Sequence, residues 1–361
     1  MEALRRASGL FLRSIIFDDS SDDEQWYSQR RQHRLQHQQA EGNPRMQRKG
    51  GGSRKGKRPN KERFRVEHHH LLMRDYFVDN PIYDAKVFRR RFRMRQSLFL
   101  RIMNDLVVKK PTEFSQCFDA LGIPSLSPQQ KMMAALRMLA YGASADQLDE
   151  YIRMSESSVL KYLKLFCQAT IEIYGNQYLR KPTAADLGQV LKLHESKGWP
   201  GMLGCLDVMH WEWKNCPVAW RGAFQGKEGV PTVALEAVVD HRLWFWHAWF
   251  GMPGSNNDLN ILDRSPLFED LSHGRAPQVT FTANGKEYTQ GYYLADGIYP
   301  SWKIFVKTIS EPQNPKRQLF SQCQEGQRKD VEHAFGVLQV SYLFDESYKF
   351  YCLFFSNLNY C

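Results

Sequence analysis

The stretch GCLDVMHWEW, residues 204–213, places one carboxylate inside an apolar run. Residues 202–206 are apolar or small, and Val208 and Met209 follow Asp207, so the pattern predicts a buried strand with Asp207 in its middle. A buried carboxylate costs free energy unless something pairs with it. The position therefore indicates a site at which Asp207 has a partner.

Two further acids stand in comparable settings. The run YYLADG, residues 292–297, predicts a short strand that ends at Asp296, and GQRKDVEHAFGVLQ, residues 326–339, predicts a helix with Glu332 at the edge of its apolar face. Carboxylates from two strands and one helix can converge on Mg²⁺ or Mn²⁺, which prefer oxygen ligands. Two such ions about 3.5 to 4 Å apart stabilise both oxygens of an in-line phosphoryl displacement. The three acids therefore predict a two-metal nuclease.

Each acid taken alone also fits a structural role. An Asp before Gly, as at Asp296, is a common turn former. Glu332 has basic neighbours and fits a solvated helix face, while Asp258, which follows two asparagines, fits a helix cap. The metal-ligand interpretation depends on the occurrence of all these acids together and in order.

Four segments resemble the PIF/Harbinger transposases, a family with a plant transposon-protein branch and a derived nuclease in animals. These segments are GCLDVMHWEWKNCPVAWRGAFQGKEG (204–229), HAWFGMPGSNNDLNILDRSPLF (247–268), YYLADGIYPSW (292–302) and RKDVEHAFGVLQ (328–339). The resemblance implies a DDE endonuclease with an RNase H-like core and Asp207, Asp296 and Glu332 as the catalytic, metal-binding triad. It also implies Asp258 as a fourth metal ligand.

The sequence between the acids predicts the elements of such a core. Residues 231–239 and 243–250 form a predicted hairpin, and a helix near 257–263, a strand at 304–308 and a long helix from about residue 316 follow. The predicted order is β-β-β-α-β-α-β-α, an α/β class with an RNase H-like mixed sheet. The seven tryptophans of this region are predicted to pack in the core.

The remaining chain divides into three further predicted parts around the nuclease domain at 200–340. Residues 1–62 are a predicted disordered tail, since they lack apolar periodicity, and residues 45–65 hold ten basic residues and one acid. This tail either binds DNA phosphates, acts as a nuclear localisation signal centred on RKGKRP (54–59), or only solubilises the chain. Residues 63–180 are predicted to be helical, and residues 341–361 form an atypical C-terminal tail.

The helical part contains a pattern that suits a helix-turn-helix. Predicted helices at 128–141, 145–152 and 155–167 would present Ser157, Ser158 and Lys161 to the major groove. A plain three-helix bundle gives the same pattern. The arginines of FRRRFRM, residues 88–94, either contact phosphates or solvate a helix.

Several other functions are disfavoured. The seven cysteines show no zinc-ligand spacing, which predicts a reduced intracellular setting. The cluster His68–His70 is predicted to be a polar linker end. No stretch of 18 uncharged apolar residues predicts a membrane span, and the N-terminus does not suit a secretory signal.

The sequence therefore predicts a nuclear, Mg²⁺- or Mn²⁺-dependent DNA endonuclease of the transposase type. Its DNA substrate would be transposon ends, with Lys214, Arg221 and Lys227 as candidate backbone contacts; the resemblance adds a Myb-like partner protein, and a homo-oligomer stays open. After Gln339 the resemblance ends, which predicts an uncovered Glu332 helix and impaired activity. The alternative is a domesticated, non-catalytic nuclear DNA-binding or chromatin accessory protein.

Overall fold

The computed structural model describes residues 61–120, 122–214, 216–272 and 277–341. The chain divides into two compact units, Met1–Arg63 and Phe64–Cys361, and only the second is described over most of its length. The predicted basic tail up to residue 60, with its RKGKRP signal, and the C-terminal segment 342–361 lie outside the described residues. Within the described ranges, no helix is long and apolar enough to cross a membrane.

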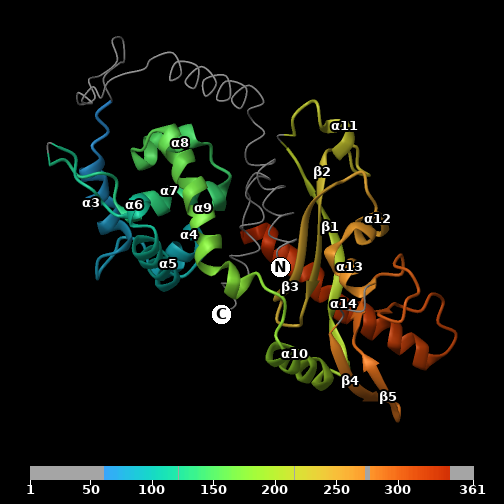
Figure 1. Ribbon diagram of the computed structural model, residues 1–361. Coiled ribbons are helices and arrows are strands. Elements are labelled where there is room, and N and C mark those ends of the chain that lie inside the picture. Colours follow the sequence, from blue (N-terminus) through green and yellow to red (C-terminus); the bar gives the residue numbers. More distant parts are fainter. Residues whose placement is uncertain (1–60, 121, 215, 273–276, 342–361) are drawn as a thin grey trace, which may run out of the picture. The chain divides into compact units, whose positions relative to one another are not determined.

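The N-terminal part of the second unit is helical (Figure 1). Its helices are α3 (Arg65–Tyr76), α4 (Ala85–Phe92), α5 (Gln96–Lys109), α6 (Pro111–Phe114), α7 (Pro128–Tyr141), α8 (Ala145–Ile152) and α9 (Glu156–Tyr178). The start of α7 is fixed by a capping box, in which the Ser127 hydroxyl accepts the Gln130 N–H and the Gln130 side chain accepts the Ser127 N–H. Its end is fixed by Gly142 in the left-handed region. Both bounds agree with the sequence prediction.

Two predictions about these helices are wrong. The helix predicted to end at residue 167 continues to Tyr178, because Ala169, Thr170 and Tyr174 extend its buried face. The histidine cluster His68–His70 is not a linker end, since it lies within α3. The α8–α9 turn leaves Ser157 and Lys161 exposed and Ser158 half-buried; DNA binding by α9 stays a prediction.

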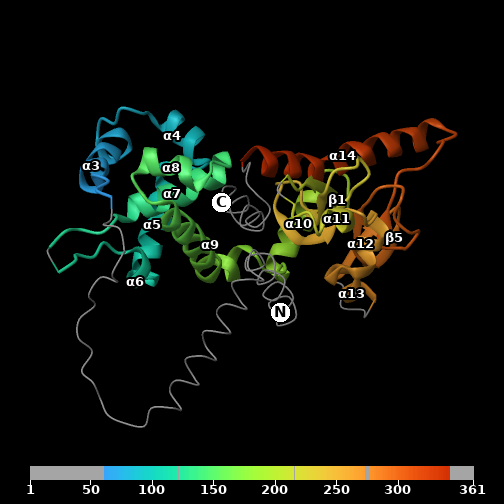
Figure 2. The same cartoon turned by 90° about the horizontal axis from the view of Figure 1, so that it is seen from above.

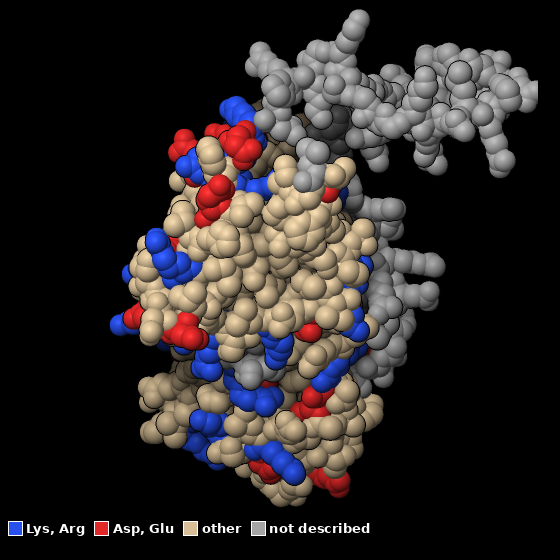
Figure 3. Space-filling view, turned by 90° about the vertical axis from the view of Figure 1, so that its left-hand side faces the viewer, with Lys and Arg blue, Asp and Glu red and all other residues tan. Residues whose placement is uncertain are grey.

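Most of the face that carries these helices is uncharged, with basic residues gathered in its lower half and acidic residues scattered from its upper edge to its lower edge (Figure 3). The last turn of α4 contributes Arg89, Arg90 and Arg91. Arg91 is the half-buried member of the three, and its guanidinium lies 3.8 Å from the ring centroid of Tyr83. The other two arginines are exposed, so they are the part of FRRRFRM that can contact phosphates.

The C-terminal part is a mixed α/β structure built on one five-stranded sheet. Its strands are β1 (Met202–Glu212), β2 (Thr232–Val239), β3 (Phe245–Pro253), β6 (Tyr292–Leu294) and β7 (Phe305–Val306), in the order β3-β2-β1-β6-β7. The pairs β1–β2 and β2–β3 are antiparallel, whereas β1–β6 and β6–β7 are parallel. The predicted change from antiparallel to parallel pairing is confirmed.

Helices cover both faces of this sheet (Figure 2). They are α10 (Ala184–Ser196), α11 (Arg221–Phe224), α12 (Asp258–Arg264), α13 (Pro266–Ser272) and α14 (Pro315–Ser341). Side chains alternate between the faces of a strand. Cys205 of β1 belongs to the core cluster that includes Val331 and Ala334 of α14, whereas its neighbour Leu206 packs with Leu262 of α12. The near-continuous apolar run of β1 thus reflects a strand covered on both sides.

Three details of the predicted fold are wrong. A second hairpin, β4 (Gln278–Ala283) and β5 (Lys286–Gln290), was not predicted, although Asn284 and Gly285 at its turn both have positive φ and form a typical hairpin signal. No helix separates β6 from β7, where the chain forms turns. Trp302 is 38% exposed, so not every tryptophan packs in the core, as Trp213 does.

Candidate functional site: an acidic centre beneath a helix

Strand pairing places two of the predicted acids just beyond the paired part of β1 and β6. The last pair of this parallel ladder is Cys205 and Leu294, and Asp207 and Asp296 each follow two residues later, Asp296 after the end of β6. By the two-residue period of a strand, Asp207 shares the face of Cys205, which is the face covered by α14. Both carboxylates also act electrostatically on the buried Tyr299, so the fold brings two acids that are 89 residues apart in the chain near that residue.

Glu332 reaches the same face from α14, and one basic side chain links it to Asp207. The Arg328 Nη1 atom lies 3.4 Å from Asp207 Oδ2 and 3.4 Å from Glu332 Oε1. Arg328 and Glu332 are one helical turn apart, which puts them on one side of α14. The two carboxylates are thus arranged around a positive charge.

The buried position of Asp207 changes its acidity. The pKa of Asp207 is raised to about 6, chiefly by burial; the Val208 N–H and Arg328 oppose this shift, and the Asp258 and Glu332 carboxylates contribute to it. The first cause is the loss of hydration that a charged carboxylate suffers in a low-dielectric site. The last causes show that Asp258 and Glu332 lie within electrostatic reach of Asp207.

Asp258 belongs to the opposite face of the sheet. It is the first residue of α12, and its Oδ1 atom lies 3.7 Å from Nε2 of His210. The helix cap is Asn257, whose side chain accepts the Asn260 N–H. Asp258 is therefore not the helix cap, and its carboxylate faces His210 instead.

All four candidate ligands are carboxylates, and hard divalent ions prefer such oxygen ligands. Among the described residues, however, no group of three or more Asp, Glu, His or Cys side chains is already spaced to hold a metal ion. Arg328 supplies the positive charge between Asp207 and Glu332 in this state. A divalent ion between these two carboxylates requires Arg328 to move aside.

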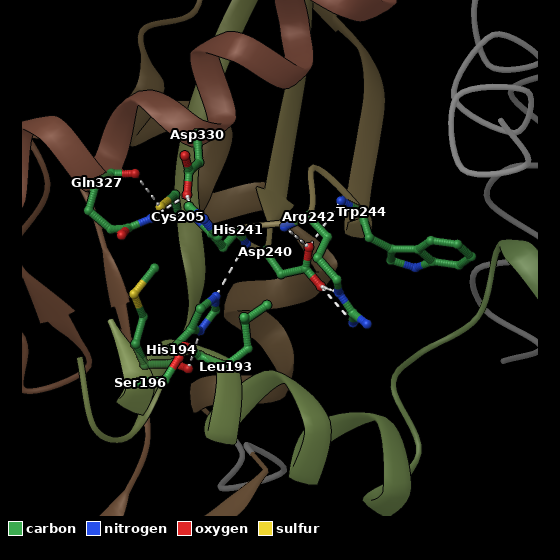
Figure 4. A network of polar contacts seen from close by, with 11 residues as sticks. Leu193, His194, Ser196, Cys205, Asp240, His241, Arg242, Trp244, Gln327 and Asp330 are labelled. Carbon is green, nitrogen blue, oxygen red and sulfur yellow. Dashed lines mark hydrogen bonds and ion pairs between the residues drawn. The ribbon is translucent and has the colours of Figure 1, made fainter. Parts of the chain in front are cut away.

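A polar network behind the acidic centre fixes α14 (Figure 4). His241 Nδ1 lies 2.8 Å from Asp330 Oδ2, and the Gln327 side chain also donates to Asp330. The His194 Nδ1 donates to the Met202 carbonyl at 2.8 Å, so its Nε2 accepts the His241 N–H at 3.2 Å. Burial lowers the pKa of His194, in agreement with this neutral tautomer. The network joins α10, the β2–β3 turn and α14, two residues before Glu332.

The candidate DNA-contacting residues lie in the segment between β1 and β2. Lys214, Arg221 and Lys227 are all exposed, and the Arg221 Nε donates to the Cys216 carbonyl at 3.4 Å. The rings of Trp213, Trp220 and Phe224 pack together here with centroids 5.0 to 6.1 Å apart. Packed aromatic rings thus support the segment that carries these basic side chains.

Sequence reasoning treated Arg328 only as a charged neighbour of Glu332 and assigned no role to His210. The i, i+4 spacing of Arg328 and Glu332 was visible in the sequence, but the contact with Asp207 spans 121 residues. His210 lies three residues after Asp207. Its partner comes from a different element, so no local pattern pointed to it.

The fold and the site define an α/β protein with an acidic centre formed by adjacent parallel strands and a covering helix. Residues 176–346 match the family of plant transposon proteins, and residues 69–107 match a domain of unknown function. The plant transposon proteins and the curated relatives below belong to the Harbinger-derived transposase family, to which this chain is similar. The predicted resemblance is thereby confirmed.

Curated relatives agree with this similarity. Human HARBI1, a candidate nuclease by name, is 25% identical over 216 residues, which are 59% of this chain and 58% of that protein. The ALP1-like protein of Arabidopsis thaliana is 28% identical over 199 residues, or 53% of this chain and 47% of that protein. A second Arabidopsis thaliana protein, named antagonist of like heterochromatin protein 1, is 24% identical over 73% of this chain and 67% of its own length. No solved structure matches the chain.

Proposed function

We propose that this chain is a divalent-metal-dependent DNA endonuclease of the Harbinger transposase type. The observation that carries the proposal is that Asp207 and Asp296 follow the paired part of two neighbouring strands, while α14 brings Glu332 to Asp207 through their common contact with Arg328. The strand order β3-β2-β1-β6-β7, antiparallel and then parallel, supports an RNase H-like core. Nuclease names among the relatives support the activity, although the chain covers less than two thirds of the length of the first of them.

The metal ligands in this proposal are Asp207, Asp296 and Glu332, with Asp258 as a fourth carboxylate. Mg²⁺ or Mn²⁺ bound there supplies charge stabilisation for the attacking and leaving oxygens of a phosphodiester. Asp207 has a pKa of about 6, so it is ionised and able to hold a cation above that pH. Arg328 balances the charge of Asp207 and Glu332 until the ion binds.

The DNA in this proposal runs past the acidic centre toward the end of β1. Glu212 ends that strand five residues beyond Asp207, which is about 17 Å at the rise of an antiparallel strand. Lys214, Arg221 and Lys227 follow, and exposed basic side chains bind phosphates by releasing counterions. Transposon ends as substrate, a nuclear location and a Myb-like partner complete the proposal.

The test is Mn²⁺-dependent nicking of supercoiled plasmid by the full chain. Asp207→Asn, Asp296→Asn and Glu332→Gln each remove one ligand charge with little change of volume. Asp263→Asn is the matched control, because Asp263 is an exposed acid on α12. We expect nicking by the wild type and the control and its loss in the three ligand variants. Equal nicking by the wild type and Asp207→Asn refutes the proposal.

A second function, that of a non-catalytic DNA-binding or chromatin accessory protein, is favoured by one observation. Arg328 lies where a cation between Asp207 and Glu332 would bind, and no ligand group is preassembled among the described residues. For this function we expect that the chain binds a DNA duplex and that calorimetry detects no binding of Mn²⁺. Mn²⁺ binding that Asp207→Asn abolishes contradicts it.

A further inference from the structure

Lys307 holds the loop that follows Asp296. It comes directly after β7, and its Nζ atom donates to the Tyr299 carbonyl at 2.7 Å, to Ser301 Oγ at 3.2 Å and to the Gly297 carbonyl at 3.4 Å. A lysine ammonium has three donors and no acceptor, so these three oxygens use its hydrogen-bonding capacity in full. One side chain thus ties down loop 297–301 at three points.

The same loop orients the Asp296 carboxylate. The Gly297 N–H donates to Asp296 Oδ1 at 2.6 Å, and the Tyr299 N–H donates to the Asp296 carbonyl at 3.2 Å. Gly297 and Tyr299 are the residues whose carbonyls bind Lys307. The lysine therefore acts on Asp296 through these two residues, because the carbonyl of each accepts from Lys307 and the N–H of each donates to Asp296.

The buried Tyr299 side chain also holds this loop in place. Its ring is 1% exposed and lies 5.6 Å from the ring of Phe305 in β7. Burial raises the pKa of Tyr299, and the carboxylates of Glu236, Asp258, Asp207 and Asp296 raise it further, in that order. Tyr299 thus holds the loop through its buried ring, while the half-buried Lys307 holds it through hydrogen bonds to two backbone carbonyls and to Ser301.

We propose that Lys307 is a positioning residue of the acidic centre, which fixes the orientation of the Asp296 carboxylate. This inference rests on the proposed function, because it takes Asp296 as a metal ligand. In this role Lys307 acts through loop 297–301. Its effect is to hold a ligand at the end of a short strand, where β6 itself ends two residues earlier. Residues that orient a metal ligand typically contribute about 10- to 100-fold to metal affinity or activity.

The experiment compares four forms of the full chain: wild type, Lys307→Met, Lys307→Arg and Lys303→Met. Lys303 is an exposed lysine four residues earlier, so its variant is matched in charge and segment. Three quantities are measured: amide hydrogen exchange of residues 297–301 in EDTA, Mn²⁺ affinity by calorimetry, and plasmid nicking against Mn²⁺ concentration.

We expect Lys307→Met to speed exchange in residues 297–301 and to weaken Mn²⁺ binding about tenfold or more. Half-maximal nicking should then need a correspondingly higher Mn²⁺ concentration. Lys307→Arg retains hydrogen-bond donors, so its exchange rate and its Mn²⁺ affinity should lie between those of Lys307→Met and the wild type. Lys303→Met should match the wild type in both quantities. Faster exchange with unchanged Mn²⁺ affinity shows that Lys307 only closes a loop and overturns the inference, as does unchanged exchange.

The two levels of the proposal fail in different ways. A wild type that binds Mn²⁺ but does not nick DNA refutes the endonuclease, while exchange and Mn²⁺ affinity still decide the role of Lys307. A wild type that nicks DNA beside a Lys307→Met variant with normal Mn²⁺ dependence refutes the inference alone. A wild type that binds no Mn²⁺ refutes both.

Discussion

Replacing Asp207 by Asn should stabilise the metal-free protein while abolishing nicking. The folded protein holds Asp207 with a pKa of about 6, against an ordinary value of 3.8. A pKa difference of about two units corresponds to about 3 kcal/mol. Only 16% of the side chain is exposed, so solvent screening reduces this little. Asn keeps the shape of the side chain and can still accept the Val208 N–H.

The sign of the pH dependence follows from proton binding. Between about pH 4 and pH 6 the folded protein keeps a proton on Asp207 that the unfolded chain has lost, so stability falls as pH rises through this window. Above pH 6 the full cost is present, and below pH 4 both states are protonated. Asp207→Asn removes the cost, so its advantage over the wild type is about 3 kcal/mol at pH 8, shrinks between pH 6 and pH 4, and is absent below about pH 4.

The assay is urea unfolding in EDTA, followed by tryptophan fluorescence, at several pH values from 4 to 8. Asp263→Asn, on the exposed side of α12, corrects for the loss of one negative charge. A variant that is less stable than the wild type at pH 8 refutes the reasoning. So does an advantage that grows toward acid pH, because burial would then not be the cause of the shift.

Three further outcomes are expected. Arg328→Met removes a group that lowers the pKa of Asp207. The nicking rate, which should rise with pH as Asp207 ionises, should therefore reach half of its maximum at a higher pH than in the wild type. A midpoint pH equal to or below that of the wild type contradicts this role. Asp330→Asn weakens the contact with His241 and should lower the free energy of unfolding in urea by about 1 to 3 kcal/mol. An unchanged free energy of unfolding would show that the network of Figure 4 does not stabilise the fold. Gly254→Ala puts a Cβ 1.8 Å from a threonine hydroxyl oxygen of β2 and should cost about 1 to 3 kcal/mol; a thermal melt equal to that of the wild type would show that this turn relaxes freely.

Local sequence patterns predicted most secondary elements here because their signals are short in range. The capping box at Ser127 and the glycine at Gly142 fix α7 without help from other elements. The hairpin β2–β3 follows from two β-branched and aromatic runs around the turn at 240–242. The missed β4–β5 hairpin carried the same kind of signal in Asn284-Gly285. This hairpin is therefore also determined by a short-range signal.

Tertiary structure alone determined how the acids relate to one another. The sequence by itself gave the identities and order of Asp207, Asp258, Asp296 and Glu332, because each stands in a recognisable local context. The placement of Asp207 and Asp296 after two neighbouring paired strands, and the approach of Asp258 from the opposite face, depend on which strands pair and which helix covers each face. The bridging contact of Arg328 and the hold of Lys307 on the Asp296 loop depend on the same pairing. Such contacts join residues distant in the chain, and their geometry is fixed only when the sheet and its covering helices have packed.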